Sequence, residues 1–405
     1  MKAFDYVIAG GGAAGCVLAA RLAEEKGISV CLVEAGGKGR DLFVRMPAGN
    51  GFVFGNPRLD WGYNSVAQSS LNGRSLYYPR GKALGGSSIV NGMVYMRGVA
   101  ADYDSWGFDG WSYANVLPYF RRSEAARDRC DAWHGSDGPL KTEPARNFGE
   151  IDRAFIAAAK SAGHNQVDDF NGPYRTGVAR NDSTVSKGVR QSAAIAYLKR
   201  PPRNLTIRTG CQITQILIEN RKATGLKIMG GEIIRASREV ILCQGAFGTP
   251  QLMMLSGIGP TDHLTEHGIA VVADLPSVGA HLSDHPDVPL QYGSDRIDLS
   301  YAKYQRLDMA ALLMGQWLLN GSGPGGGPLF STVLFHAFDD HSYPELEVFM
   351  TPMVIEENFN HGTPESVPWL QRLGRQLLVR GRKMARPGVQ IDINLERPRS
   401  TGTVR

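Results

Sequence analysis

The sequence has 405 residues, 42% of them hydrophobic and 20% charged, which is the composition of an ordinary soluble globular protein. Its formal net charge of +5 is small for this length and is spread along the chain, so we expect no nucleic-acid partner. The longest mostly apolar run, MAALLMGQWLL at 309–319, is too short to span a bilayer, so we expect no membrane span.

Cysteine usage indicates a reducing compartment. The five cysteines are widely spaced and none forms a CxxC pair, which is typical of cytosolic proteins rather than of secreted, disulfide-bonded ones. The first residues also place Asp5 and a glycine run where a signal peptide would need its apolar stretch. These observations predict a cytoplasmic protein.

The first elements in chain order form a βαβ unit. Residues 6–9 are a short apolar strand, 13–26 carry apolar side chains at helical spacing, and ISVCLVE at 28–34 is a second buried strand. Gly10, Gly12 and Gly15 satisfy G-x-G-x-x-G at the junction of the first strand and the helix. In that motif the first glycine makes the tight turn, the second lets backbone approach a pyrophosphate, and the third allows close helix–strand packing.

This unit predicts a dinucleotide site. The free N–H groups and the dipole at the helix N-terminus favour a pyrophosphate, and Glu34 ends the second strand where an acid would bind a ribose hydroxyl. An acid at this position disfavours NADP but does not separate NAD from FAD. The alternative is a glycine-rich turn in an unrelated α/β fold.

A second glycine-rich stretch follows at residues 78–104. Five glycines lie close together and alternate with Ser87, Ser88 and Asn91. Such a stretch can lay backbone N–H and C=O groups flat against a planar ligand, with small hydroxyl donors beside it. The alternative is a glycine-rich surface loop.

Two long stretches resemble the signatures of the glucose–methanol–choline (GMC) oxidoreductase family. The first is the glycine-rich stretch at 78–104, and the second is GAFGTPQLMMLSGIGP at 245–260. Shorter stretches that also resemble the family lie at 134–140, 188–198 and 278–286. The first matches through Gly81, Leu84, Gly85, Gly86, Ser87, Ser88, Val90, Asn91, Tyr95, Gly98 and Asp104.

The resemblance implies FAD rather than NAD. It places residues 10–15 at the pyrophosphate, Glu34 at the adenosine ribose, residues 80–87 and 91–94 along the pyrophosphate and isoalloxazine ring, and Trp61 near the flavin. Val90 stands where some relatives attach FAD through a histidine, so we expect non-covalent FAD. The implied cofactor-binding residues are Gly10, Gly12, Ala13, Ala14, Gly15, Glu34, Ala35, Trp61, Arg80, Gly81, Gly85, Gly86, Ser87, Asn91, Gly92, Met93, Val94, Ile213 and Ala246.

We therefore expect an α/β fold with a Rossmann-like FAD-binding domain and a discontinuous α+β substrate domain built on an antiparallel sheet. The first domain would comprise residues 1–145 and 185–290, the second 146–184 and 291–405. In the second domain, 345–352 and 389–396 are predicted strands. The basic stretch at 366–384 has helical periodicity, which we interpret as a solvated helix face rather than a membrane or partner surface.

No histidine in this sequence fits the role of catalytic base. By the resemblance, His134, His281 and His285 have structural or cofactor-side roles. His263 and His267 are spaced i,i+4 on an expected helix, but no third ligand is evident, so we interpret them as a surface pair and expect no metal site. The family base is a histidine near the C-terminus of longer chains, so we predict no catalytic residue in these 405.

The end of the sequence leads to the same expectation. After the predicted strand at 389–396, RPRSTG has turn chemistry, and residues 403–405 look like the start of a returning strand. We therefore expect that a C-terminal catalytic segment belongs to this protein, with its own cleaved segment as one possible partner.

The leading functional hypothesis is FAD-dependent oxidation of a primary alcohol to an aldehyde by hydride transfer to the flavin N5. The alternatives are a catalytically incomplete FAD-binding fragment and a GMC-fold flavoenzyme with lyase or decarboxylase chemistry; an NAD dehydrogenase is disfavoured. By the resemblance, Ser331 stands where a glutamate often lies in the family, which favours a neutral small-molecule alcohol over a choline-like one. Oxidase and dehydrogenase activity are not distinguished.

Overall fold

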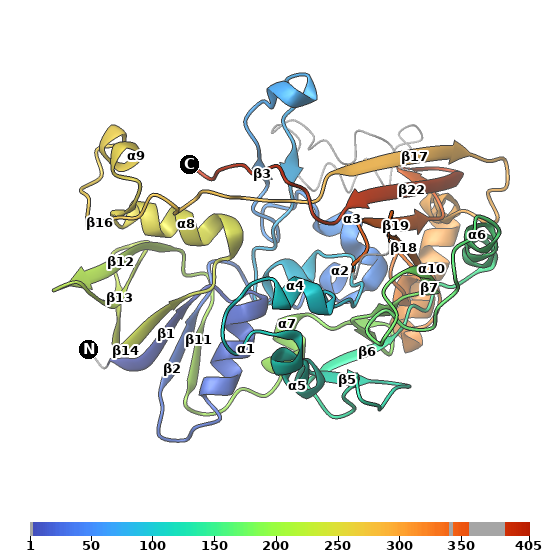
Figure 1. The fold of residues 1–405 in the computed structure, drawn as a ribbon. Coiled ribbons are helices and arrows are strands. Elements are labelled where there is room, and N and C mark those ends of the chain that lie inside the picture. Colours follow the sequence, from blue (N-terminus) through green and yellow to red (C-terminus); the bar gives the residue numbers. More distant parts are fainter. Residues whose placement is uncertain (1–2, 340–342, 356–384) are drawn as a thin grey trace.

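The computed structural model describes residues 3–339, 343–355 and 385–405 and contains two main β-sheets joined by helices and loops (Figure 1). A six-stranded sheet lies at the left of this view and a five-stranded sheet at the right. The predicted α/β fold is confirmed. The stretch at 366–384 that predicted a basic helix lies outside the described residues.

The six-stranded sheet contains the predicted βαβ unit. Strand β1 pairs in parallel with β2 on one side and β14 on the other, and the helix α1, Ala13–Leu22, connects β1 to β2. The predicted helix is therefore confirmed, although it ends four residues earlier than the periodicity suggested. In spatial order the strands are β11 Leu205–Arg208, β2 Val30–Val33, β1 Phe4–Ala9, β14 Ile233–Leu242, β13 Lys222–Ile228 and β12 Ile213–Glu219.

This sheet is buried on both faces. Val7 and Ala9 of β1 pack into one apolar cluster with Leu226 and with Leu252 of α8, Gly245–Leu255. Ile8 points the other way, into a cluster that includes Cys16 of α1 and the helix α7, Ala193–Tyr197. Burial on both faces explains why β1 and β2 read as continuous apolar runs rather than alternating ones. Because β1 pairs in parallel with β2 and β14, the C-terminal ends of these three strands lie at one edge of the sheet.

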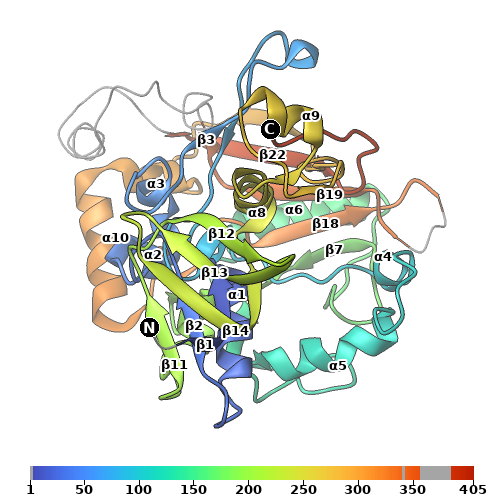
Figure 2. The ribbon, with the colours of Figure 1, turned by 90° about the vertical axis from the view of Figure 1, so that its left-hand side faces the viewer.

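The five-stranded sheet is entirely antiparallel. Its spatial order is β17 Asp287–Gly293, β22 Gly388–Leu395, β19 Leu346–Thr351, β18 Thr332–His336 and β7 Gly177–Arg180. The strands predicted at 345–352 and 389–396 are thus confirmed as β19 and β22. Helix α6, Glu150–Ser161, packs on β7 and β18 through Ile156 and Leu334. Figure 2 shows the helix α10, Leu307–Asn320, set apart from the six-stranded sheet.

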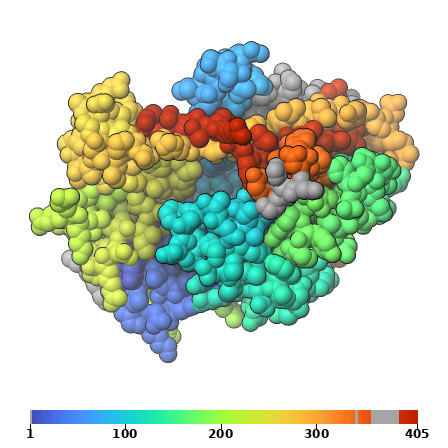
Figure 3. All heavy atoms as spheres, in the orientation of Figure 1, coloured from blue at the N-terminus to red at the C-terminus, as the bar shows by residue number. Residues whose placement is uncertain are grey.

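The prediction that residues 403–405 begin a strand returning along β22 is wrong. Residues 397–405 do not turn back along β22 but run across the surface toward α8, beside residues 278–282 (Figures 1 and 3). Val404 N donates to Gly279 O at 2.7 Å, and Leu282 pairs with Gly402. Arg397 anchors the start of this segment through an ion pair with Asp102. The turn residues in RPRSTG therefore redirect the strand instead of reversing it.

Shorter elements complete the described part of the chain. The hairpin of β3 and β4 protrudes from the upper edge in Figure 1. Within the described ranges, each helix is too short or too polar to cross a bilayer. The shorter α-helices are α2 Leu42–Arg45, α3 Asn50–Val53, α4 Ala100–Asp104, α5 Tyr113–Ser123 and α9 Thr261–Glu266. The shorter strands are β3 Tyr63–Asn64, β4 Tyr77–Tyr78, β5 Glu124–Ala126, β6 Leu140–Pro144, β8 Asp182–Ser183, β9 Val185–Ser186, β10 Val189–Arg190, β15 Ile258–Gly259, β16 Ala273–Asp274, β20 Val354–Ile355 and β21 Ala385–Arg386. The 3-10 helices are η1 Pro47–Gly49, η2 Ser69–Leu71, η3 Gly86–Ile89, η4 Tyr301–Gln305 and η5 Pro324–Gly326.

Candidate cofactor-binding site

In the turn between β1 and α1, neighbouring backbone leaves no room for a side chain at the first and third glycines of the motif. Gly10 has φ +96°, and a Cβ there would lie 2.6 Å from the carbonyl oxygen of Cys243, which follows β14. A Cβ on Gly15 would collide with the carbonyl oxygen of Gly10. The first and third glycines of the motif thus hold the helix against the ends of two strands, and any other residue would push them apart.

The N-terminus of α1 is open for an anion. Gly12 is the N-cap, no acidic side chain lies in the first turn, and Ala13 and Ala14 are exposed. The first N–H groups of a helix have no partners within it, and the helix dipole favours negative charge at this end. A phosphate group placed here would meet backbone donors with no carboxylate in the first turn of the helix.

The second glycine-rich stretch packs directly on this turn. Gly85 N donates a hydrogen bond to Gly11 O at 2.7 Å. Gly86 has φ +52°, and a Cβ on it would lie 2.6 Å from Gly12 Cα. Gly81 lies against the carbonyl oxygen of Gly86 in the same loop, and Ser87 beside it is exposed. Two motifs that are about seventy residues apart in sequence therefore meet backbone to backbone.

Glu34 is buried beside the turn, with only 6% of its surface exposed. Its Oε2 accepts a hydrogen bond from Gly11 N and its Oε1 one from Gly36 N, both at 2.8 Å. Burial raises the pKa of Glu34, while these backbone donors and Lys82 act in the opposite direction. Each carboxylate oxygen keeps acceptor capacity for a ligand hydroxyl. The sequence placed Gly11 within the pyrophosphate turn at 10–15, but it did not indicate that the N–H of Gly11 would bind Glu34.

Residues 91–94 form the loop that follows the 3-10 helix η3. Gly92 lies against the ring of Phe330, and Met93 is buried with φ +64°. Val94 forms an isolated β-bridge with Ser183. Asn91 is exposed. The loop therefore connects the glycine-rich turn before α1 to the strands beside the five-stranded sheet.

Arg190 fixes this loop from behind, and the motif analysis did not identify it. Its fully buried guanidinium donates to Asn91 O and Asn91 Oδ1 at 2.8 Å each, to Val44 O at 3.1 Å, and to the side chain of Asn50. Burial lowers the pKa of Arg190 to about 9. The signal in the sequence was its place in the stretch at 188–198, but only the fold shows which backbone groups it holds.

An aromatic cluster lies on the outer side of the glycine loop. Trp61 stacks on Tyr63 with ring centroids 6.0 Å apart, and Trp61 N donates to Arg80 O at 2.9 Å. The guanidinium of Arg80 lies 4.7 Å from the ring centroid of Phe247, in the first turn of α8. The structure thus brings Trp61 and Arg80 to the N-terminus of α8.

Three remaining predicted residues lie at the margins of this site. Ala246 is exposed in the first turn of α8, three residues after Cys243. Ala35 follows Glu34 and is half-buried. Ile213 begins β12, and its side chain points into the apolar core. Because Cys211 N donates to Glu34 O at 2.9 Å, the segment that leads into β12 lies beside Glu34.

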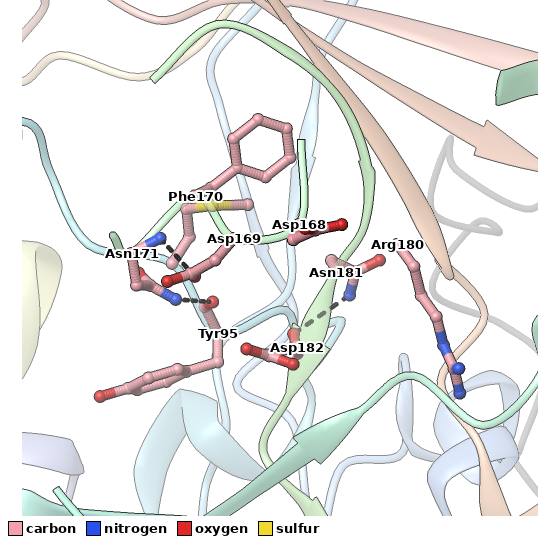
Figure 4. Close-up of a pocket in the computed structure, with 9 residues that line it drawn as sticks. Tyr95, Asp168, Asp169, Phe170, Asn171, Arg180, Asn181 and Asp182 are labelled. Atoms are coloured by element: carbon pink, nitrogen blue, oxygen red, sulfur yellow. Dashed lines mark hydrogen bonds between the residues drawn. The ribbon is translucent and has the colours of Figure 1, made fainter. Parts of the chain in front are cut away.

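A separate polar cavity lies behind residues 95–97 (Figure 4). Its volume is about 10 Å³, enough for one water molecule and far too small for a cofactor. In Figure 4, Asn171 Nδ2 reaches Tyr95 O, at 3.1 Å. The polar residues around the cavity are Asp168, Asp169, Asn171, Arg180, Asn181 and Asp182.

Beside this cavity, His134 is fully buried between two carboxylates. Its Nε2 lies 2.9 Å from Asp169 Oδ2 and its Nδ1 lies 3.0 Å from Glu124 Oε2. Arg97 donates to the same Glu124 oxygen at 2.8 Å. Burial alone would lower the pKa of His134, but the hydrogen bonds to Asp169 and Glu124 outweigh it and raise the pKa to about 9. With both ring nitrogens engaged, His134 serves the structure rather than proton transfer.

Comparisons with known proteins agree on one family. Residues 4–287 match the family model described as GMC oxidoreductase. Oxygen-dependent choline dehydrogenases of Photobacterium profundum and Rhizobium etli are each 40% identical, over 82% and 87% of this chain and 60% and 65% of their own lengths. The chain thus spans less than two thirds of these curated relatives.

Solved structures give the same result. A formate oxidase variant of Aspergillus oryzae RIB40 superposes with a TM-score of 0.83 at 26% identity, over 99% of this chain and 74% of that one. Pyridoxine 4-oxidase from Mesorbium loti gives 0.79 at 29% identity, over 99% and 73%.

Proposed function

Because this chain belongs to the GMC oxidoreductase family, whose cofactor is FAD, we propose that it holds FAD non-covalently and forms the cofactor-binding part of an enzyme that oxidises a primary alcohol to an aldehyde. The observation that carries the proposal is the contact between the two glycine-rich motifs at the N-terminus of α1, where Gly85 N donates to Gly11 O.

The residues of this site fit the cofactor. Gly10 and Gly86 leave a backbone cradle that a single Cβ would fill, and the open N-terminus of α1 supplies donors for a pyrophosphate. Glu34 offers buried acceptors for a ribose hydroxyl. Val90 is 4% exposed and has no nucleophilic atom, which supports non-covalent attachment.

We assign roles to the predicted residues on that basis. Residues 10–15 and Ala246 would hold the pyrophosphate, the backbone at Ile213 would approach the adenine, and residues 80–87 and 91–94 would lie along the pyrophosphate and the ring system. When bound, FAD supplies the hydride acceptor for alcohol oxidation. The chain itself would orient the substrate and exclude water.

One face of the five-stranded sheet is the proposed substrate side. Phe349 of β19 packs on Phe330 with ring centroids 5.1 Å apart, and Phe330 lies against Gly92, so this face looks toward the cofactor loop. Strand alternation puts buried Gln390 and Asp392 of β22 on the same face.

The substrate class has two candidates. Ser331, buried at the start of β18, supports a neutral primary alcohol. Asp392, on the face just described, favours a cationic alcohol, and the 40%-identical relatives are named choline dehydrogenases. Choline is therefore the second candidate, to be tested beside neutral aliphatic and aromatic alcohols.

Alcohol oxidation also needs a base within hydrogen-bond reach of the substrate hydroxyl. Among the described residues we assign no histidine to that role: His134 is enclosed by two carboxylates, and His263 and His267 lie on α9 and at its C-cap, at the far end of the molecule from the five-stranded sheet. We propose that the base belongs to a part of the enzyme outside these 405 residues. The alternative is a protein that binds FAD without turnover, or one with other flavin chemistry.

Intact mass spectrometry of the purified protein, followed by anaerobic mixing with each alcohol, tests the proposal. We expect FAD to be released on denaturation, and we expect an alcohol to bleach the flavin absorbance only when a further polypeptide accompanies the 405-residue chain. Absence of FAD would refute the cofactor assignment. Flavin reduction by the chain alone would show that the base lies within it.

A further inference from the structure

Three potential metal ligands meet at one end of the five-stranded sheet, outside the cofactor site. His285 precedes β17, Glu347 lies in β19, and Glu396 follows β22. A nitrogen of His285 and one carboxylate oxygen from each glutamate all lie within 4.8 Å of one another. These residues are separated by more than 45 positions in sequence, so only the sheet register brings them together.

The register explains why the three side chains point the same way. Asn394 of β22 pairs with Asp287 on one side and with Glu347 on the other. Two residues further along, Glu396 faces His285 across the antiparallel pair, and Leu395 N donates to Pro286 O at 3.2 Å. Residues two apart in a strand share a face. Glu396 therefore stands between one ligand on each neighbouring strand.

Without a cation, this cluster is poorly satisfied. Glu396 Oε1 is buried, has no hydrogen-bond partner among the described residues, and lies 3.4 Å from His285 Nδ1. Glu347 and Glu396 each place a carboxylate oxygen within 4.8 Å of the other and of the same imidazole nitrogen. Two carboxyl groups are thus held together with one imidazole as the nearby donor. A cation would remove the repulsion between them and use the unpartnered oxygen.

We propose that His285, Glu347 and Glu396 bind a divalent first-row metal ion of the Zn²⁺ class. One imidazole and two carboxylates form a ligand set that Zn²⁺ accepts, with a fourth position left for water. Ligand atoms around tetrahedral Zn²⁺ lie about 3.4 Å apart, given bonds of about 2.0–2.1 Å. His285 is exposed, so rotation of its ring can close the remaining gap and also provides a path for the ion.

The bound ion would cross-link the edge of the sheet. β17 is exposed along its whole length and, among the described strands, pairs with β22 alone. A metal held by His285 on one side and by Glu347 on the other would tie this edge strand to the two strands beside it. The site is therefore structural in its effect, and the proposal does not depend on the proposed oxidoreductase activity.

A second cluster must be removed before the site can be measured. On α9, His263, Glu266 and His267 also lie within 4.8 Å of one another, and the two imidazole rings are 4.7 Å apart. Glu266 is the third candidate ligand that was not evident from the spacing alone. His263 and Glu266 lie on the six-residue helix α9 and His267 is its C-cap, so all three come from one short turn near the surface. They would nevertheless bind added Zn²⁺ and obscure the result.

The experiment is a calorimetric titration with Zn²⁺ of chelator-treated protein carrying His263→Gln and His267→Gln. We expect one equivalent to bind, and we expect H285Q, E347Q and E396Q each to weaken binding at least tenfold, since even loss of a supporting residue costs about 10–100-fold. D284N is the matched control: it removes the exposed carboxylate next to His285 and should leave the affinity unchanged.

Thermal unfolding with and without Zn²⁺ is the second measurement. The double-histidine background should melt at a higher temperature when Zn²⁺ is added, and E347Q, which keeps the shape of the side chain, should lose that increase while remaining folded. No stoichiometric binding in the background protein, or equal binding by the three ligand variants and D284N, would overturn the proposal. Either result would indicate that the carboxyl groups of Glu347 and Glu396 share a proton instead of binding a metal ion.

Discussion

Replacement of Gly86 by alanine tests the contact on which the cofactor site depends. Gly86 has φ +52°, and for an L-residue this left-handed conformation costs about 1–2 kcal/mol. The new Cβ would also lie 2.6 Å from Gly12 Cα, so the two loops must separate by almost 1 Å. Overpacking of this kind costs about 1–3 kcal/mol more, which gives a total of about 2–5 kcal/mol.

Gly73→Ala is the matched control. Gly73 has φ +76°, but a Cβ there would meet nothing within 4 Å. It should therefore cost only the backbone strain of about 1–2 kcal/mol and leave the cofactor site intact. The difference between the two variants isolates the contact between the loops at Gly12 and Gly86.

Urea denaturation and titration of the apoprotein with FAD give the two readouts. We expect Gly86→Ala to lose at least tenfold in FAD affinity, about 1.4 kcal/mol, because separation of the loops displaces the backbone donors of the cradle. Gly73→Ala should bind FAD as the unaltered protein does. If the two variants lost equal stability and bound FAD equally well, the role assigned to this contact would be refuted.

Two further substitutions test other parts of the fold. Glu34→Gln places an amide NH₂ group against the backbone N–H of Gly11 or of Gly36. We therefore expect urea denaturation to show a free energy of unfolding lower by about 1–3 kcal/mol, and the FAD titration to show weaker binding. Unchanged FAD affinity would argue against a ribose contact. Folding raises the pKa of His134 from 6.5 to about 9. Protonated His134 therefore stabilises the fold fully below pH 6.5, and this stabilisation is lost as the pH rises through 9. The loss in unfolding free energy is at most about 3 kcal/mol. His134→Gln should abolish that fall in unfolding free energy between pH 6 and pH 9.5, and an identical pH profile in the variant would contradict the assignment.

The local parts of the cofactor site could be predicted from sequence. The βαβ unit depends on the spacing of Gly10, Gly12 and Gly15, on periodicity, and on Glu34 at a strand end. All of these lie within about thirty residues, so one motif contains the information. The strands β19 and β22 were predicted for a similar reason, since period-2 alternation is visible within a single segment.

Contacts that depend on distant segments could not be predicted. The role of Arg190 requires that residues 44, 50 and 91 converge on one guanidinium. The path of residues 397–405 depends on hydrogen bonds with residues 279–282, and β17 and β19 already occupy both edges of β22. The cluster of His285, Glu347 and Glu396 likewise depends on strand order, which no local pattern encodes.

The pairing of residues 397–405 with residues 278–282 has a mechanical consequence. A single chain segment between two sheets can twist about its own axis, so the sheets it joins can rotate relative to each other. Two segments joined by the hydrogen bonds at Leu282, Gly279, Gly402 and Val404 resist that twist, because rotation would shear the bonds between them. Bending remains possible. Along this edge of the molecule, the paired segments would therefore limit rotation of one sheet relative to the other.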